Sequence, residues 1–133
     1  MTEYQNSKRY DLEDRTLNFA KRVIEFVGKL EKTLANIEIS KQLIRSSGSV
    51  GANYIEANEA LSKKDFVMRI KICRKEAKES CYWLKLVTCN KELESERKWL
   101  IRESSELTKI FGSILIKSQG LRWFIGILIL FRI

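Results

Sequence analysis

The amino-acid sequence predicts an all-α protein, folded as an antiparallel up-and-down four-helix bundle. The 133 residues are enough for one domain with a single buried core. The chain has no proline and only six glycines, so it lacks most of the turn residues that a sheet-rich fold of this size needs. Apolar residues recur at intervals of three and four along most of the chain, which is the spacing of helices with one buried side.

Residues 11–34 are predicted to form the first helix, because their apolar residues share one side of it. The residues expected on this inner side are Leu17, Ala20, Ile24, Val27, Leu30 and Leu34. In the connection that follows, Asn36 favours a turn and Ser40 can cap the next helix. Short connections of this kind are typical of antiparallel neighbours.

The second helix is predicted over residues 39–61, and its middle, residues 46–52, consists almost entirely of small side chains. Gly48 and Gly51 each cost about 1 kcal/mol relative to alanine inside a helix. We therefore expect tight packing or a backbone contact to offset this cost. The inner side is expected to carry Leu43, Ser47, Val50, Tyr54, Ala57 and Leu61.

Ser62 and Asp65 have the form of a capping box, which predicts a third helix from this point to about Cys89. Its expected inner side carries Phe66, Ile70, Cys73, Ala77, Ser80, Leu84 and Val87. Ser95 is expected to open a fourth helix that reaches about Lys117. Its expected inner side carries Trp99, Leu100, Leu107, Ile110, Phe111, Ile114 and Leu115. Residues 1–119 are thus predicted to be the bundle domain.

Residues 120–133 are predicted to be a separate apolar tail, because they show no polar face. The tail is shorter than the roughly 20 residues that span a bilayer. Three roles stay open: a contact between subunits, an appended sequence that did not arise with the bundle, or insertion at a membrane interface together with the fourth helix.

The formal net charge of +8 predicts a surface that attracts polyanions such as nucleic acid. Cys73, Cys81 and Cys89 are odd in number and contain no C-x-x-C pair, which favours free thiols in a reducing compartment. Residues 1–14 lack the apolar segment of a secretory signal. We therefore expect a cytoplasmic protein.

One stretch of the predicted second helix, residues 42–57 (QLIRSSGSVGANYIEA), is distinctive. It resembles the signature of the four-helix-bundle proteins encoded by intervening sequences of bacterial 23S ribosomal RNA genes. Phe19-Ala20, Asp65-Phe66 and Glu79 fall where the pattern of this family places them, and the resemblance covers about residues 11–119. The sequence departs from the pattern after Gln119, where family members usually end in a short polar tail.

The resemblance has implications for assembly and partners. Known members of the family form pentamers in which five bundles make a barrel, which implies a barrel-like homo-oligomer here. A distantly similar bundle is the accessory subunit of diversity-generating retroelements, where it associates with a reverse transcriptase and RNA. This implies a surface for nucleic acid.

The predicted third helix carries the strongest concentration of charge. From residue 63 to residue 91 there are nine cations and three anions, a net charge of +6. Several of these cations follow helical spacing, so they can track a phosphate backbone from one side; an ordinary solvated basic face is the alternative. The candidate nucleic-acid-binding residues are Lys63, Lys64, Arg69, Lys71, Arg74, Lys75, Lys78 and Lys85. Because only Tyr82 and Trp83 are near for stacking, sequence-specific readout is expected to be weak.

Four polar residues of the family-like pattern, Arg45, Asn53, Glu56 and Glu79, are predicted to form a structural network. An arginine paired with a carboxylate across the second and third helices would fix their register. The alternative is that these groups line a site at a junction between subunits.

The sequence argues against catalysis and against a bound metal or other cofactor. Glu56 with Glu59, and Glu76 with Glu79, are spaced like the carboxylates of di-iron bundles, but the chain has no histidine to complete the ligand set. The same lack removes Ser-His and Cys-His pairs for nucleophilic catalysis. The G-x-x-G of residues 48–51 lies inside a helical pattern and not in the loop of a KH module.

Three hypotheses follow from the sequence. The first is a homo-oligomeric interaction protein whose basic surface binds RNA or DNA through phosphates. The second is a protein-binding adaptor that docks a nucleic-acid enzyme such as a reverse transcriptase. The third, a bundle anchored to a membrane through residues 123–133, is the least favoured.

Overall fold

Residues 2–132 form four long helices and one short 3-10 helix. The computed structural model describes the backbone of residues 2–132 and the side chains of residues 12–119. In chain order, the elements are α1 (Thr2–Gly28), α2 (Leu34–Asn58), α3 (Lys63–Leu86), η1 (Lys91–Leu93) and α4 (Glu94–Arg132). Residues 2–132 contain no strand, so the predicted all-α class with four helices is confirmed.

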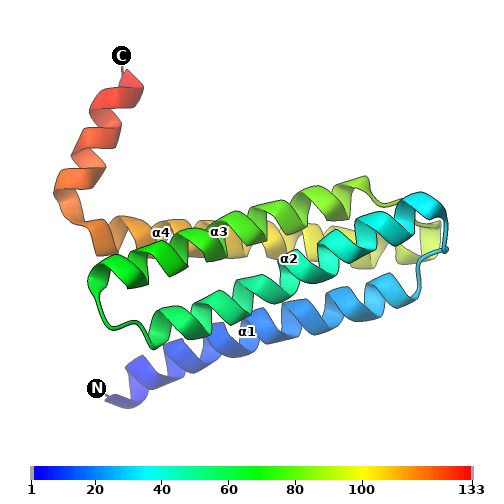
Figure 1. Ribbon diagram of the computed structural model, residues 1–133, viewed down its shortest axis with the longest axis horizontal. Coiled ribbons are helices and arrows are strands. Elements are labelled where there is room, and N and C mark those ends of the chain that lie inside the picture. Colours follow the sequence, from blue (N-terminus) through cyan, green and yellow to red (C-terminus); the bar gives the residue numbers. More distant parts are fainter. Residues whose placement is uncertain (1, 133) are drawn as a thin grey trace.

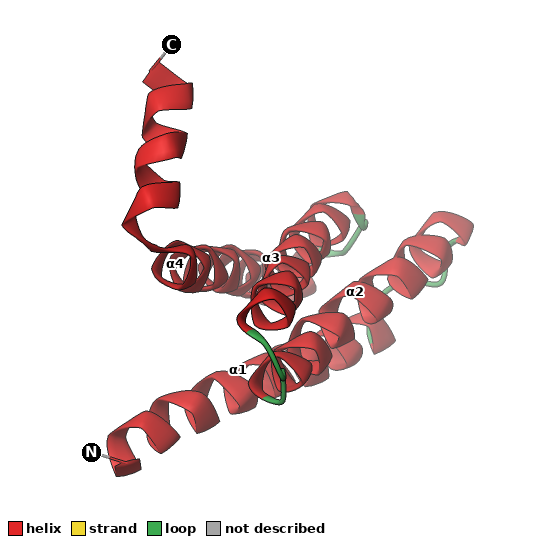
Figure 2. Ribbon diagram, turned by 60° about the vertical axis from the view of Figure 1, so that its left-hand side comes forward, coloured by secondary structure: helices red, strands yellow, loops and turns green. Residues whose placement is uncertain are grey.

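The four helices lie side by side along the long axis of the molecule, and the loops between them lie at alternate ends (Figure 1). α3 makes the most extensive contacts, with α2 and with α4 (Figure 2). Side-chain pairs fix the register of α2 and α3. Arg45 bonds to Glu79, and Asn53 bonds to Arg69, so residue numbers rise along α2 as they fall along α3.

The connection between α1 and α2 lies earlier in the chain than predicted. α1 ends at Gly28, and the hydroxyl of Thr33, not of Ser40, caps α2 by accepting the N–H of Asn36 at 3.1 Å. Asn36 is buried in the first turn of α2, where its amide donates to the carbonyl oxygens of Glu31 and Thr88 and accepts the N–H of Thr88. The residue predicted to favour a turn therefore holds two loops together.

The Ser62 half of the predicted capping box is confirmed. The hydroxyl of Ser62 accepts the N–H of Asp65 at 3.0 Å, and α3 begins at the next residue after this cap. α3 ends at Leu86, a little before the predicted end at Cys89.

α4 is longer than predicted, because its backbone stays helical to Arg132 and does not end near Lys117. The last part of α4, orange to red in Figure 1, turns away from the other helices in both views. The predicted tail, residues 120–133, has its side chains outside the described residues.

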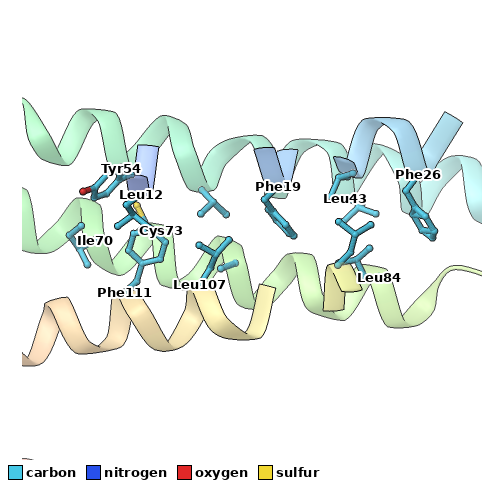
Figure 3. Packing of buried hydrophobic residues seen from close by; sticks show 14 of the residues in the cluster. Leu12, Phe19, Phe26, Leu43, Tyr54, Ile70, Cys73, Leu84, Leu107 and Phe111 are labelled. Carbon is cyan, nitrogen blue, oxygen red and sulfur yellow. The ribbon is translucent and has the colours of Figure 1, made fainter. Parts of the chain in front are cut away.

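The core runs along the axis between the helices, and Figure 3 shows its aromatic and aliphatic side chains facing one another. α2, α3 and α4 bury most of the residues predicted for their inner sides; Leu61, which is fully exposed, is an exception. The largest fully buried side chains are Phe19, Phe26, Phe111, Leu43, Ile70, Leu84, Leu100 and Leu107.

The predicted inner side of the first helix is wrong for Leu17 and Ile24, although Leu30 is buried as predicted. Leu17 is 52% exposed and Ile24 is 56% exposed, whereas Phe19, Val23 and Phe26 are buried. Both sets have helical spacing, and α1 turns the set with two phenylalanines inward because aromatic rings remove more apolar area from water. Leu17 and Ile24 lie on the outer surface of the bundle, whereas Val27 packs against the core.

The two glycines of α2 have different environments. A Cβ on Gly51 would lie 2.9 Å from Oγ1 of Thr16, so this glycine allows α1 to approach closely, as expected. A Cβ on Gly48 would meet no atom within 4 Å, and Gly48 is exposed on the outer side of α2. Contacts within the bundle therefore offset the low helix propensity of glycine at Gly51 but not at Gly48.

Candidate nucleic-acid interface

Five of the eight cations of α3 lie on the side of the helix that adjoins α4. Lys71, Lys75 and Lys78 are exposed and lie one helical turn apart, with Arg74 between them. Together with Leu115 of α4, these four side chains line a hollow of about 360 Å³. The basic face predicted from the sequence therefore has a second wall.

A second hollow, of about 350 Å³, continues along the same two helices. Lys78 lines both hollows, so the two are adjacent along α3 and α4, and we call them together the α3/α4 groove. The second hollow is lined by Lys78, Cys81, Tyr82, Lys85, Ser105 and Thr108. From Lys71 to Lys85 the groove extends for roughly 21 Å, at 1.5 Å per helical residue.

Two of the three acidic residues of α3, Glu76 and Glu79, interact with Arg45 of the opposite neighbour, α2. Glu79 accepts a bond from Arg45 of α2 at 3.2 Å and another from Nε1 of Trp83 at 3.1 Å. Glu76 is buried, and this burial, together with the charge of Glu79, raises the pKa of its carboxyl. A raised pKa means that Glu76 is less readily ionised. Both effects keep negative charge away from the α3/α4 groove.

Two acidic residues of α4 are engaged by α1. Arg15 bonds to both carboxylate oxygens of Glu103, at 2.9 and 2.7 Å, and Arg22 bonds to both oxygens of Glu96, at 3.0 and 2.8 Å. The guanidinium of Arg22 also lies 3.4 Å from the ring centroid of Trp99. These bidentate pairs direct Glu96 and Glu103 toward α1, and neither of them lines the groove.

The remaining predicted cations occupy different positions. Lys63 and Lys64 are exposed in the first turn of α3, away from the residues that line the groove. Arg69 is half-buried and donates to Oδ1 of Asn53 on α2 at 3.2 Å. Arg69 therefore links two helices, whereas the groove cations extend into solvent.

The predicted polar network is divided in the structure. Arg45 pairs with Glu79, and Asn53 pairs with Arg69, so two separate contacts join α2 to α3. Glu56 is exposed on α2 and belongs to neither contact.

The wall formed by α4 was not predicted from the sequence. Ser105, Thr108, Gly112 and Leu115 recur at helical spacing, and three of them are small or carry a hydroxyl group. A Cβ on Gly112 would lie 3.8 Å from Nε of Arg74, which is an ordinary contact distance, so Arg74 lies beside α4 at this point. The sequence signal that could have predicted this wall is the run of small and hydroxyl-bearing residues at helical spacing in the fourth helix.

The side chains of residues 12–119 contain no group of three histidine, cysteine, aspartate or glutamate residues placed to hold a metal ion. Across the described part of the chain, no helix offers a stretch that is both long and apolar enough to traverse a bilayer.

The fold and the groove define a class of small helical-bundle proteins with a basic cleft between two helices. The family model of the 23S rRNA-intervening sequence protein matches residues 8–113. The chain belongs to this family, which confirms the resemblance seen in the sequence.

A solved structure is also similar to this chain. It is a crystal structure of a protein of unknown function from the S23 ribosomal protein family of Bacteroides thetaiotaomicron. The two are 33% identical; the match covers 81% of this chain and 97% of the other, with a TM-score of 0.69. Comparison with curated proteins gives no significant match.

Proposed function

We propose that the protein is a non-enzymatic, homo-oligomeric interaction protein of the cytoplasm that binds RNA or DNA through phosphates in the α3/α4 groove. One observation carries this proposal: five cations line the groove, and none of its described lining residues is acidic. A groove lined by charge of one sign concentrates counter-ions of the other sign. The groove cations are Lys71, Arg74, Lys75, Lys78 and Lys85.

The chemistry of the groove favours phosphate contacts over base readout. Lysine ammonium groups are point charges on flexible stems, which suits them to a phosphate chain of any sequence. Arg74 adds a planar guanidinium that can bind a phosphate with two bonds. We therefore expect binding that depends little on sequence and strongly on salt, because each phosphate contact releases counter-ions.

We also propose that each chain is an antiparallel up-and-down bundle within a barrel-like homo-oligomer, a pentamer by resemblance to the family. The outer surface of α1 and α2 supports assembly, because it exposes large apolar side chains. These are Leu17 and Ile24 on α1 and Ile37, Ile44 and Ile55 on α2. A mass measurement of the full chain under native conditions tests this assembly, and an absorbance ratio of the same sample tests for bound nucleic acid.

Charge reversal tests the groove directly. The triple variant Lys71→Glu, Lys75→Glu, Lys78→Glu should weaken binding to RNA and DNA alike, measured by fluorescence anisotropy over a salt series. The slope of log affinity against log salt should decrease by about 2, from roughly 0.7 for each lost single-strand contact.

The matched control reverses Lys21, Lys29 and Lys32, which are exposed on α1 and in the loop after it. This control changes the net charge of the chain by the same amount but leaves the groove intact. Equal weakening in both triple variants, or full binding by the groove variant, would contradict the proposed site.

A further inference from the structure

Tyr82 is an exposed aromatic residue that lines the α3/α4 groove. Its side chain is 57% exposed, although a tyrosine contributes nothing to phosphate binding by charge. Lys78 precedes it by one helical turn and Lys85 follows it by about one turn, so a cation lies on each side of the ring along α3. Ser105 and Thr108 of α4 form the facing wall.

The Tyr82 ring is held in place by its neighbours. It lies edge to face with Trp83, with ring centroids 4.9 Å apart and an interplanar angle of 71°. Trp83 is fixed in turn, because its Nε1 donates to Glu79 at 3.1 Å. Glu79 is itself paired with Arg45 on α2. A ring ordered in this way loses little freedom when another flat group stacks on it.

We propose that the α3/α4 groove holds a single-stranded segment of RNA or DNA, with one base stacked on Tyr82 and the flanking phosphates on Lys78 and Lys85. This inference rests on the proposed function and adds the strandedness of the ligand. Single-strand binding sites combine a basic groove that follows the backbone with aromatic rings that take bases. The α3/α4 groove contains both elements side by side.

A duplex uses this arrangement less well. The bases of a duplex are stacked on one another, so their faces are not available to Tyr82 unless a base is extruded at a cost of a few kcal/mol. The lysines would still contact its phosphates, which predicts weaker but measurable duplex binding. On the facing wall, the hydroxyl of Ser105 can donate and accept, whereas the hydroxyl of Thr108 donates to the carbonyl oxygen of Ser104 at 2.7 Å and can only accept from a ligand. Two such small polar groups select no particular base.

The experiment compares the full-length protein with its Tyr82→Ala and Tyr82→Phe variants. The probes are a labelled oligo(dT) strand and a mixed-sequence DNA duplex of the same nucleotide length, titrated at one salt concentration by fluorescence anisotropy. Tyr82→Ala should weaken binding of the single strand by roughly 5- to 150-fold, the range measured for loss of one stacked base. Duplex affinity should stay within about twofold, and Tyr82→Phe should keep the wild-type preference because it keeps the ring.

Three outcomes would overturn the inference. These are a wild-type protein that prefers the duplex, a Tyr82→Ala variant that binds the single strand as tightly as wild type, and an equal loss on both probes. If both probes bind equally well with and without the Tyr82 ring, but not to the lysine triple variant, the inference fails and the proposed function stands. If neither probe binds the wild-type protein, the proposed function fails as well.

Discussion

Replacing Gly51 with alanine should cost stability, whereas the same change at Gly48 should add it. The new Cβ at position 51 would lie 2.9 Å from Oγ1 and 3.2 Å from Cβ of Thr16. Thr16 is held there, since it is buried and its hydroxyl lies 3.0 and 2.9 Å from the carbonyl oxygens of Leu12 and Glu13. Overpacking of this kind costs about 1–3 kcal/mol.

The two variants form a matched pair, because each gains the same helix propensity of about 1 kcal/mol relative to glycine. Gly48→Ala should therefore be more stable than wild type by about that amount, as no atom lies within 4 Å of its new Cβ. The difference between the two variants isolates the contact with Thr16, and we expect it to be about 1–3 kcal/mol.

Urea unfolding followed by far-UV circular dichroism measures this difference. All samples need one protomer concentration, because assembly contributes to stability. Adding Thr16→Ala to the Gly51→Ala variant removes Oγ1 and should recover part of the loss. If Gly51→Ala proves as stable as Gly48→Ala, α1 and α2 do not approach each other as closely as the structure shows.

Two further predictions concern buried polar groups. Asn36→Ala should destabilise the bundle by about 1–3 kcal/mol in urea unfolding, since it removes the partner of Thr88 and Glu31; an unchanged midpoint would contradict this. Glu76→Gln should be more stable than wild type at neutral pH. The raised pKa of Glu76 means that the folded state binds the proton of this carboxyl more tightly than the unfolded chain does. The carboxyl therefore contributes to the free energy of unfolding below about pH 4.5, and this contribution falls as the pH rises. The charged neighbours Glu79, Arg45 and Lys75 stay in the variant, and a pH series of urea midpoints that matches wild type would refute the prediction.

The sequence predicted best where local chemistry and packing agree. Ser62 caps α3 as expected because its hydroxyl acts on an N–H only three residues away. The inner sides of α2 and α3 also follow the pattern, since each has one dominant apolar stripe. The cationic side of α3 was predicted from spacing alone, because exposed lysines at three- and four-residue intervals share a face whatever the rest of the fold does.

α1 was harder to predict, because it carries two apolar stripes and only tertiary contacts decide between them. Thr16 belongs to the buried stripe, but a pattern of apolar residues does not include it because threonine is polar. Its hydroxyl is satisfied by its own helix backbone, which makes burial inexpensive. The buried Asn36 is a similar case, because its partners include Thr88, which is far along the chain.

The groove itself lay beyond sequence reasoning for the same physical reason. A charge count gives the net charge of α3, but the sign of the electrostatic potential in a cleft also depends on the direction in which neighbouring acidic side chains point. Glu79 is engaged by Arg45 on one side of α3, and Glu103 and Glu96 are engaged by Arg15 and Arg22 on the far side of α4. The sequence pattern suggested Arg45 and Glu79 as partners, but the pairs of α1 with α4 join helices at opposite ends of the chain, so no pattern along the chain reveals them.

The positive potential of the α3/α4 groove is consequently a property of the whole bundle. Its lysines supply the charge, but the arginines of α1 and α2 determine that this charge is not neutralised from within. Loss of Arg45 would leave Glu79 without its guanidinium partner, about one helical turn from Lys75 on the same helix. A carboxylate freed in that position lowers the potential that a phosphate chain meets, because one turn rises only about 5.4 Å and screening at physiological salt acts over about 8 Å. Residues that never touch nucleic acid can therefore set how strongly the groove binds it.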